Sequence, residues 1–322
     1  MGTYRLLLAI AVALSHMGVQ VGGLNPGVMA VISFFLISGF VMTGLVRTYY
    51  MQLHSIHLFY VDRAARIFPQ YLFFLLGTLL CHWALGFKSP FLGEATLFGL
   101  FANVTVIPMD FYMFSPAVAQ TMYIPQAWSL GLELMFYLMF PLIIIGKVRM
   151  STLLLSLLVW IAAAFGAMNA DIWGYRLLPG TLFMFLLGSC IYDARKPSLR
   201  HPAVLVLLVG IGCAVALSVT GKLESPYNRE VMLGLLVGVV VLFYLAQTGR
   251  GAWDDWLGNL SYGVFLCHFL VIWLFETMGI GRNAWTIGLM VVVSVVLAYA
   301  SYMGVERPVL QWRYRLRKKR VG

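Results

Sequence analysis

The chain has 322 residues, of which 61% are hydrophobic and only 11% are charged, and its mean hydropathy is +0.88. This composition excludes an ordinary soluble globular protein, in which about a quarter of the residues are charged. The formal net charge of +10 raises the question of nucleic acid binding. The basic residues are distributed as in a membrane protein, however, so no nucleic acid partner is expected.

Ten apolar segments approach the roughly 20 residues that an α-helix needs to cross the hydrocarbon core of a bilayer. They are 4–22, 28–47, 68–86, 126–146, 150–168, 174–192, 201–220, 229–247, 257–278 and 284–304. A shorter apolar segment, 91–107, suits a re-entrant or interfacial position. The sequence therefore predicts an all-α polytopic membrane protein, with about ten transmembrane helices in a single domain over 1–322.

An even number of spans places both termini on the same side of the membrane. With both termini in the cytoplasm, 17 of the 22 Lys and Arg residues lie on the inner side. This bias agrees with the positive-inside rule, so we expect a multi-pass protein of the cell inner (plasma) membrane. The basic cytoplasmic tail, 307–322, is interpreted as a membrane-surface anchor and not as a nucleic-acid-binding arm.

The first span carries two ionisable residues, Arg5 and His16. Their separation is almost three helical turns, so both side chains share one face and lie about 16 Å apart along the axis. Arg5 is expected at the membrane surface and His16 near the bilayer midplane. An ionisable side chain at that depth is costly and indicates a functional site. The pair suits an anionic substrate whose reactive tail reaches down to a buried base.

Two further arginines, Arg63 and Arg66, lie in the inner linker before the third span, in the sequence Arg-Ala-Ala-Arg-Ile-Phe-Pro of 63–69. Residues at i and i+3 share one face of a helix. Two guanidinium groups side by side are well suited to phosphate recognition. Anchoring of the linker at the inner surface explains the same charges equally well.

Two later spans place ionisable side chains inside the membrane. Glu133, in the Trp-Ser-Leu-Gly-Leu-Glu of 128–133, lies about 10 Å from the outer end of its span, at a depth comparable with that of His16. A His16–Glu133 couple would form a general base with an orienting carboxylate, and a structural clamp between helices is the alternative. His268, about 16 Å inside the membrane, is either a second site residue or a hydrogen-bonded core histidine.

Other polar residues of the apolar spans are candidates for lining the same site: Ser38, Trp128, Ser129 and Asn259. Ser38 lies beside a glycine, so close helix packing through small residues is an alternative interpretation. The four cysteines all fall within apolar spans and form neither a disulfide pattern nor a closely spaced metal motif. No metal cofactor is expected.

Taken together, these motifs resemble the acyltransferase-3 family of integral-membrane enzymes, which O-acylate sugars of cell-surface polysaccharides. The resemblance covers nearly the whole chain and rests on six features in order. They are the Arg5–His16 spacing, the Phe-Phe…Ser-Gly-Phe of 34–40, the Arg-x-x-Arg-Ile-x-Pro of 63–69, the Trp-Ser-Leu-x-x-Glu of 128–133, the Leu-Gly-x-x-Ser-Tyr…His of 257–268 and the Glu-Arg-Pro of 306–308.

The resemblance implies a bacterial inner-membrane O-acetyltransferase that uses acetyl-CoA, or another acyl-CoA, from the cytoplasm. The acceptor would be a hydroxyl of a cell-surface or lipid-linked polysaccharide on the outer side. The resemblance would make His16 the catalytic residue. The donor-side residues would be Arg5, Arg63 and Arg66. The residues themselves suggest the hypothesis that His16 is the general base or a transient acyl carrier, and that Glu133 tunes or orients His16 or an acceptor hydroxyl.

The acyl chain, the acceptor sugar, the oxyanion stabiliser and the oligomeric state stay open. The alternative from another class is a proton-coupled secondary transporter, with His16, Glu133 and His268 as a proton relay. This alternative explains the paired arginines less well. The sequence also lacks the internal repeats that many transporters carry.

Overall fold

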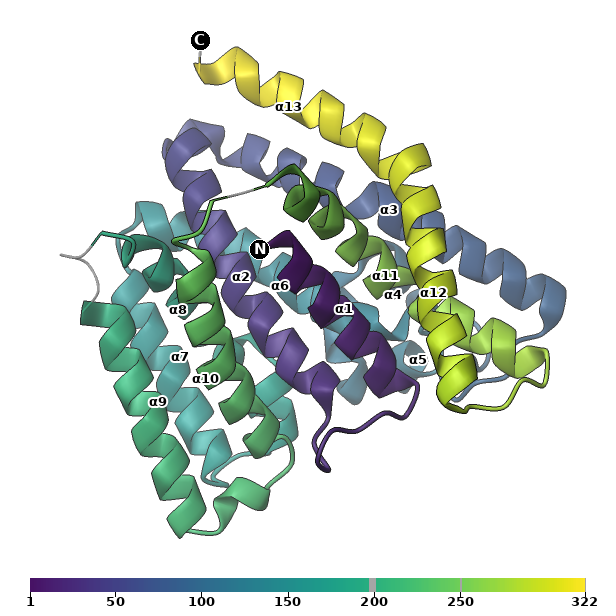
Figure 1. The fold of residues 1–322 in the computed structure, drawn as a ribbon. Coiled ribbons are helices and arrows are strands. Elements are labelled where there is room, and N and C mark those ends of the chain that lie inside the picture. The colour runs from purple at the N-terminus through teal and green to yellow at the C-terminus, as the bar shows by residue number, and fades with distance from the viewer. Residues whose placement is uncertain (197–200, 250, 322) are drawn as a thin grey trace. The chain divides into compact units, whose positions relative to one another are not determined.

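The computed structural model describes the chain except for residues 197–200, 250 and 322. The regular secondary structure of the described residues is helical, apart from two isolated β-bridges, Val21 with Leu24 and Leu92 with Thr121 (Figure 1). The chain divides into two compact units. Unit 1 contains Met1, 20–59 and 135–251, and unit 2 contains 2–19, 60–134 and 252–322.

Unit 1 is built mainly from five helices. They are α2 (Pro26–Tyr49), α7 (Arg149–Ala164), α8 (Leu178–Asp193), α9 (His201–Val219) and α10 (Asn228–Leu245), with the later part of α6 (Trp128–Ile145) and the short turns η1 (Leu53–Ser55), η4 (Ile172–Arg176) and η6 (Lys222–Glu224). Helix α8 packs against both α2 and α7 and is buried along almost its whole length, so it forms the centre of this unit.

Close contact between α2 and α8 depends on two glycines. A Cβ atom at Gly39 would lie 1.7 Å from the carbonyl oxygen of Phe185, and one at Gly188 would lie 1.9 Å from the carbonyl oxygen of Leu36. Small residues allow helix backbones to approach in this way. The structure thus supports the packing interpretation of the Ser-Gly pair in the second span.

We expect Gly188→Ala to push α2 and α8 apart and to lower the free energy of unfolding by about 1–3 kcal/mol, as overpacking does in other cores. Gly210→Ala in α9 is the matched control, because no atom lies within 4 Å of its added Cβ. The control should be neutral, or stabilising by up to about 1 kcal/mol, since alanine favours helix over glycine. Thermal unfolding in detergent measures both variants, and equal effects would contradict the close contact.

Unit 2 contains the elements that carry most of the predicted site residues. Its helices are α1 (Gly2–His16), most of α3 (Ile56–Leu85), α4 (Leu97–Thr105), α5 (Pro116–Ala119), the start of α6, α11 (Ala252–Thr277), α12 (Ala284–Ser301) and α13 (Arg307–Val321). Short turns, η2 (Ile107–Phe114), η3 (Pro125–Ala127) and η7 (Tyr302–Glu306), connect them.

Helices α1 and α11 lie side by side and run in the same direction (Figure 1). At the start of α1, the backbone N–H groups of Gly2 and Thr3 each donate to the Asp254 carboxylate over 2.9 Å, which satisfies donors that a helix N-terminus leaves free. His16 follows Gly2 by 14 residues, and His268 follows Asp254 by the same number. The cap therefore sets a register that brings the two histidines to the same level.

Three predicted boundaries are wrong. The first helix ends at His16 and not at residue 22, because Gly18 has φ +93° and cannot continue a right-handed helix. His16 is therefore the last residue of α1. The linker and the third span form one continuous helix, α3, with Pro69 inside it. The last span continues beyond Glu306, through the π-helical turn η7, into α13.

Seven helical segments of the described residues are long and apolar enough to cross a membrane. They are Pro26–Tyr49, Leu53–Leu85, Pro125–Ile145, Ile172–Asp193, Asn228–Leu245, Ala252–Thr277 and Ala284–Arg313. Three shorter apolar helices, Gly2–His16, Arg149–Ala164 and Val204–Val219, match the other predicted spans. The prediction of an all-helical protein with membrane-type helices is confirmed, whereas the count of ten and the cytoplasmic termini stay predictions.

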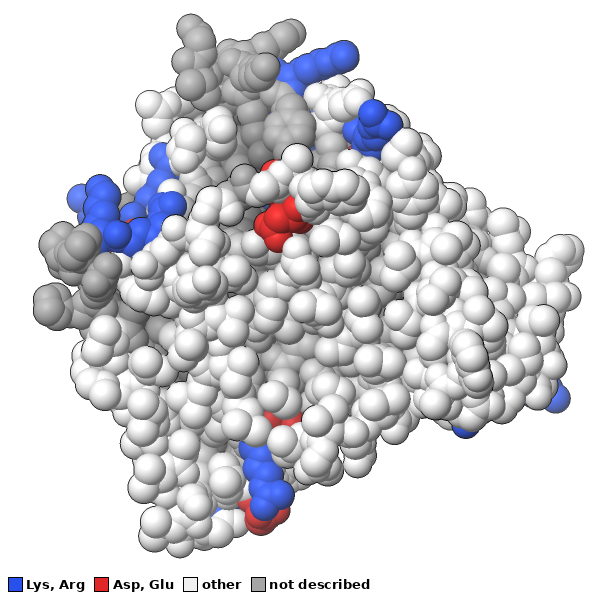
Figure 2. Space-filling model, in the orientation of Figure 1, with Lys and Arg blue, Asp and Glu red and all other residues white. Residues whose placement is uncertain are grey.

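The surface of unit 1 suits a bilayer. Figure 2 shows charged side chains near the two ends of the α9 and α10 layer and an uncharged surface between them. In the predicted basic tail, the backbone from Arg307 to Val321 is helical. The side chains of residue 314 and of 316–322 lie outside the described residues, so the anchoring role of the tail stays a prediction.

Candidate active site

The most distinctive pair of side chains in unit 2 is His16 with His268. The Nδ1 atom of His16 lies 2.9 Å from the Nε2 atom of His268. The ring centroids are 5.0 Å apart, and the ring planes differ by only 6°. The first and ninth predicted spans thus bring their histidines into direct hydrogen-bonding contact.

The two histidines differ in how deeply they are buried. His268 is fully buried in α11, with 0% of its surface exposed. His16 is half-buried at the end of α1 and packs on the Phe269 ring, with 4.8 Å between the ring centroids. Of the pair, only His16 keeps some exposed surface.

The start of α6 is fastened to the helix turn that precedes His268. The amide nitrogen of Gln126, a buried residue of η3, donates to the carbonyl oxygens of Phe265 at 2.7 Å and Leu266 at 2.9 Å. The predicted site residues Trp128 and Ser129 follow immediately, and the Ser129 hydroxyl donates back to the Gln126 carbonyl at 3.1 Å. Sequence analysis missed Gln126, although a polar residue at the start of an apolar span was the available signal.

Glu133 lies one helical turn further along α6 and is half-buried. It is close enough to Tyr262 of α11 to act on the phenol electrostatically. The Tyr262 hydroxyl in turn donates to the carbonyl oxygen of Ile67 in α3, over 3.1 Å. The proposed His16–Glu133 couple stays a prediction.

The two paired arginines of α3 are already engaged by carboxylates. Arg63 and Arg313 both donate to Asp62, and the three side chains are buried. Arg66 forms an ion pair with Glu306 and lies over the Tyr262 ring, 5.2 Å from its centroid. Each arginine thus contributes to the packing of α3, whatever else it binds.

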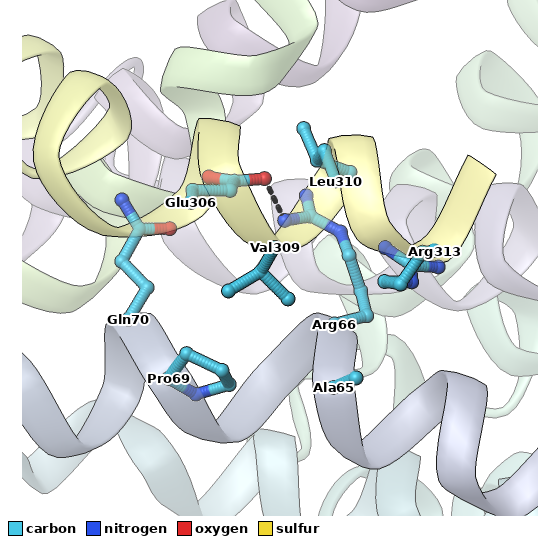
Figure 3. Close-up of a pocket in the computed structure, with 8 residues that line it drawn as sticks. All are labelled: Ala65, Arg66, Pro69, Gln70, Glu306, Val309, Leu310 and Arg313. Carbon is cyan, nitrogen blue, oxygen red and sulfur yellow. Dashed lines mark hydrogen bonds and ion pairs between the residues drawn. The ribbon is translucent and has the colours of Figure 1, made fainter. Parts of the chain in front are cut away.

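A small pocket opens beside this cluster, with about 180 Å³ of empty space that includes its open side. Figure 3 shows its lining: Ala65, Arg66, Pro69, Gln70, Glu306, Val309, Leu310 and Arg313. The Gln70 amide donates to the Ser301 hydroxyl at 2.8 Å. Among the described residues, neither Gln70 Oε1 nor Glu306 Oε2 has a hydrogen-bond partner, although both are buried.

Sequence analysis missed three members of this cluster: Asp62, Gln70 and Arg313. Asp62 is adjacent to Arg63, and Gln70 is a polar residue in an apolar span, so both carried a readable signal. Arg313 was assigned only to the basic tail. Its position depends on the continuation of the last span into α13, which the sequence reading did not predict.

The remaining predicted residues lie apart from the histidine pair. Arg5 is half-buried near the start of α1, about 16 Å along the helix from His16. The amide of Asn259 donates to the Tyr302 hydroxyl over 3.3 Å. Ser38 belongs to unit 1, where it is buried and its hydroxyl donates to that of Tyr137 over 3.4 Å.

Comparison with known proteins decides the family. The profile of the acyltransferase-3 family, described as an acyltransferase domain, matches residues 4–303. The chain belongs to this family. The matched segment contains every predicted site residue, whereas Glu306 and Arg313 lie just beyond it.

Relatives of this acyltransferase-3 chain include proteins of three bacteria. An uncharacterised protein of Aquifex aeolicus is 32% identical over 60% of this chain and 90% of its own length. A peptidoglycan O-acetyltransferase of Listeria monocytogenes is 23% identical over 95% of this chain and 54% of its own length. A Bacillus subtilis protein, whose name assigns the same activity provisionally, is 25% identical over 92% of this chain and 52% of its own length.

The chain therefore spans about half the length of the two relatives with a named activity. No solved structure matches it. The family and these relatives support membrane O-acyl transfer as the class of reaction.

Proposed function

We propose that this acyltransferase-3 protein transfers an acetyl group from acetyl-CoA to a hydroxyl of a cell-surface or lipid-linked polysaccharide in a bacterial inner membrane. The observation that carries the proposal is the partly exposed His16, hydrogen-bonded to the buried His268 within the matched family segment. The names of two relatives support an acetyl group as the group that is transferred. The donor is expected on the cytoplasmic side and the acceptor on the outer side.

In this mechanism, His16 acts as the general base. It takes the proton of the acceptor hydroxyl while the hydroxyl oxygen attacks the thioester carbonyl carbon. The carbon–sulfur bond breaks as the new carbon–oxygen ester bond forms. The proton then passes from His16 to the departing thiolate of CoA, so one ester and one thiol leave the site. General bases of this kind contribute about 10²–10⁴-fold to the rate.

An acyl-histidine route is the second version of the same function. The His16 nitrogen would attack the thioester first, and the acceptor would then take the acyl group from the imidazole. The two routes differ when the acceptor is omitted. Rapid quenching with radiolabelled acetyl-CoA leaves label on the protein only in the acyl-histidine route.

The function is tested by the release of free CoA thiol from acetyl-CoA. The purified protein in nanodiscs is supplied with acetyl-CoA, with or without an envelope polysaccharide extract. We expect thiol release that depends on the acceptor. Proton uptake into proteoliposomes without any thiol release would instead support a proton-coupled transporter and would contradict the proposal.

We assign the binding of the acetyl-CoA phosphate groups to the arginine cluster of unit 2. Arg63, Arg66 and Arg313 supply three positive charges, against the two negative charges of Asp62 and Glu306. The cluster is therefore cationic even with both carboxylates ionised, and it attracts phosphate groups. Arg5, on another helix of the same unit, is assigned to the same donor.

We expect Arg66→Ala to raise the Kd for acetyl-CoA by about 10-fold to 100-fold, the loss of one charge-assisted hydrogen bond to a phosphate. Arg229→Ala is the matched control, because Arg229 is an exposed arginine that pairs with an acid, Glu224, in unit 1. Calorimetric titration of the protein in nanodiscs measures both affinities. A wild-type Kd in the Arg66 variant, together with a lower unfolding temperature, would establish that Arg66 is a structural residue only.

A further inference from the structure

We propose that His268 is a positioning residue that fixes the tautomer of His16, so that Nε2 of His16 is the atom that accepts the proton. The catalytic role of this tautomer rests on the proposed function, but the tautomer itself is a property of the protein without substrate. His268 would not touch the substrate, since it has no exposed surface.

The first step concerns the geometry of the contact. Ring atoms in face-to-face contact lie about 3.5 Å or more apart, whereas the two facing nitrogens are 2.9 Å apart. The ring planes are nearly parallel, at 6°, and their centroids are 5.0 Å apart, so nitrogens only 2.9 Å apart must lie almost on the line that joins the centroids. The imidazoles thus meet edge to edge, with one hydrogen lying between His16 Nδ1 and His268 Nε2.

The second step assigns that hydrogen. The other nitrogen of His268, Nδ1, lies 3.3 Å from the carbonyl oxygen of Val264, one helical turn earlier in α11. A carbonyl oxygen only accepts, so Nδ1 of His268 carries the proton and donates it. In the neutral ring, Nε2 of His268 is then an acceptor, because the hydrogen bond at one nitrogen sets the state of the other. His16 Nδ1 must donate, and its Nε2 keeps the free lone pair.

The reverse arrangement is disfavoured by the same contacts. If His268 Nε2 were the donor in a neutral ring, the lone pair of its Nδ1 would face the Val264 carbonyl oxygen inside the protein. If both nitrogens carried protons, a full positive charge would lie on a ring with 0% exposure. Burying an unpaired acceptor or a charge is costly.

The third step explains how the pair is held. His268 packs between the rings of Phe265 and Phe269, with centroid distances of 6.2 Å and 5.2 Å. The Asp254 cap on Gly2 fixes the register of α1 against α11. Because His16 is already held in one orientation and one tautomer, no entropy has to be lost during the reaction to bring the base into position.

The direct test is nitrogen NMR of the protein in nanodiscs, labelled with ¹⁵N in its histidine rings. The chain has six histidines, and the His16 signals are assigned by their loss in His16→Gln. We expect His16 to be protonated at Nδ1 in the wild type. In His268→Met, which offers no comparable acceptor, the population should shift towards the Nε2-protonated form. In His268→Gln the side-chain oxygen still accepts, so the wild-type form should persist.

Kinetics provide the second readout. We expect His268→Met to lower kcat by about 10-fold to 100-fold, the usual cost of losing an orienting partner, with KM for acetyl-CoA nearly unchanged. His268→Gln should recover most of the rate. Equal losses in the two variants, or a wild-type His16 protonated at Nε2, would overturn the assignment. A wild-type enzyme with no turnover but with the expected tautomer would reject the proposed function and leave the positioning role standing.

Discussion

Replacing His16 with alanine is expected to lower kcat for acetyl transfer by about 10²–10⁴-fold, because the variant lacks the proposed general base. The substitution also leaves Nε2 of the buried His268 without its partner, which costs about 1–3 kcal/mol of stability. The protein should still insert and fold. Thiol release and thermal unfolding, measured on the same nanodisc preparation, separate the two effects.

The matched control for this variant is His57→Ala. His57 is an exposed histidine near the start of α3, so its removal should change neither the rate nor the unfolding temperature. Full activity in His16→Ala would remove His16 from the mechanism. A large loss of activity that appears only with loss of folded protein would leave His16 with a structural role.

The largest effect on stability is expected for Asp62→Ala. The Asp62 carboxylate accepts hydrogen bonds from Arg63 Nε at 3.2 Å and from Arg313 Nε at 3.1 Å. The Arg63 and Arg313 side chains are only 8% and 6% exposed, respectively. Removing the acid takes a carboxylate partner away from two buried side chains of like charge, and breaking a buried ion pair costs about 3–5 kcal/mol. Thermal and denaturant unfolding in detergent measure the loss.

Glu224→Ala is the control for Asp62→Ala, because Glu224 belongs to an exposed ion pair with Arg229. Its effect should stay within about 0.5 kcal/mol. Adding Arg63→Met and Arg313→Met to Asp62→Ala should recover much of the lost stability, since apolar side chains of similar size often replace a buried ionic cluster without loss. A destabilisation of Asp62→Ala no larger than that of the control would contradict a compensated buried cluster.

The sequence located the two histidines but not their contact. Both were placed about 16 Å into the membrane from the helix rise alone, and the structure brings them together across 252 residues of chain. Which spans are neighbours depends on packing, such as the fit of Gly2 against Gly258 and the Asp254 cap. A pattern along one chain does not carry that information.

The arginines of α3 are a second case in which the sequence identified residues but not their partners. The i, i+3 spacing predicted that Arg63 and Arg66 share one face of a helix, and both lie in α3. Their carboxylate partners, Asp62 and Glu306, came from the structure, because Glu306 lies 240 residues beyond Arg66. An ionisable residue in an apolar segment indicates that a partner exists without identifying it.

The predicted helix boundaries differ from the observed ones where backbone geometry, and not hydropathy, determines where a helix ends. Hydropathy continues through residue 22, but the positive φ of Gly18 ends α1 earlier. Conversely, a separate span was predicted over 68–86, and α3 instead begins at Ile56 and passes through Pro69. Helices of membrane proteins tolerate proline because neighbouring groups satisfy the carbonyl that it leaves free.

The most direct test of the central claim follows the acetyl group itself. The protein in nanodiscs is incubated with acetyl-CoA labelled with ¹³C in the acetyl carbonyl and with envelope polysaccharide, and the polysaccharide is then examined by NMR. We expect a base-labile ester carbonyl on the polysaccharide, formed in equal amount to the released CoA thiol and absent with His16→Ala. Thiol release without a labelled ester, or labelled ester in undiminished amount from His16→Ala, would contradict an O-acetyltransferase centred on His16.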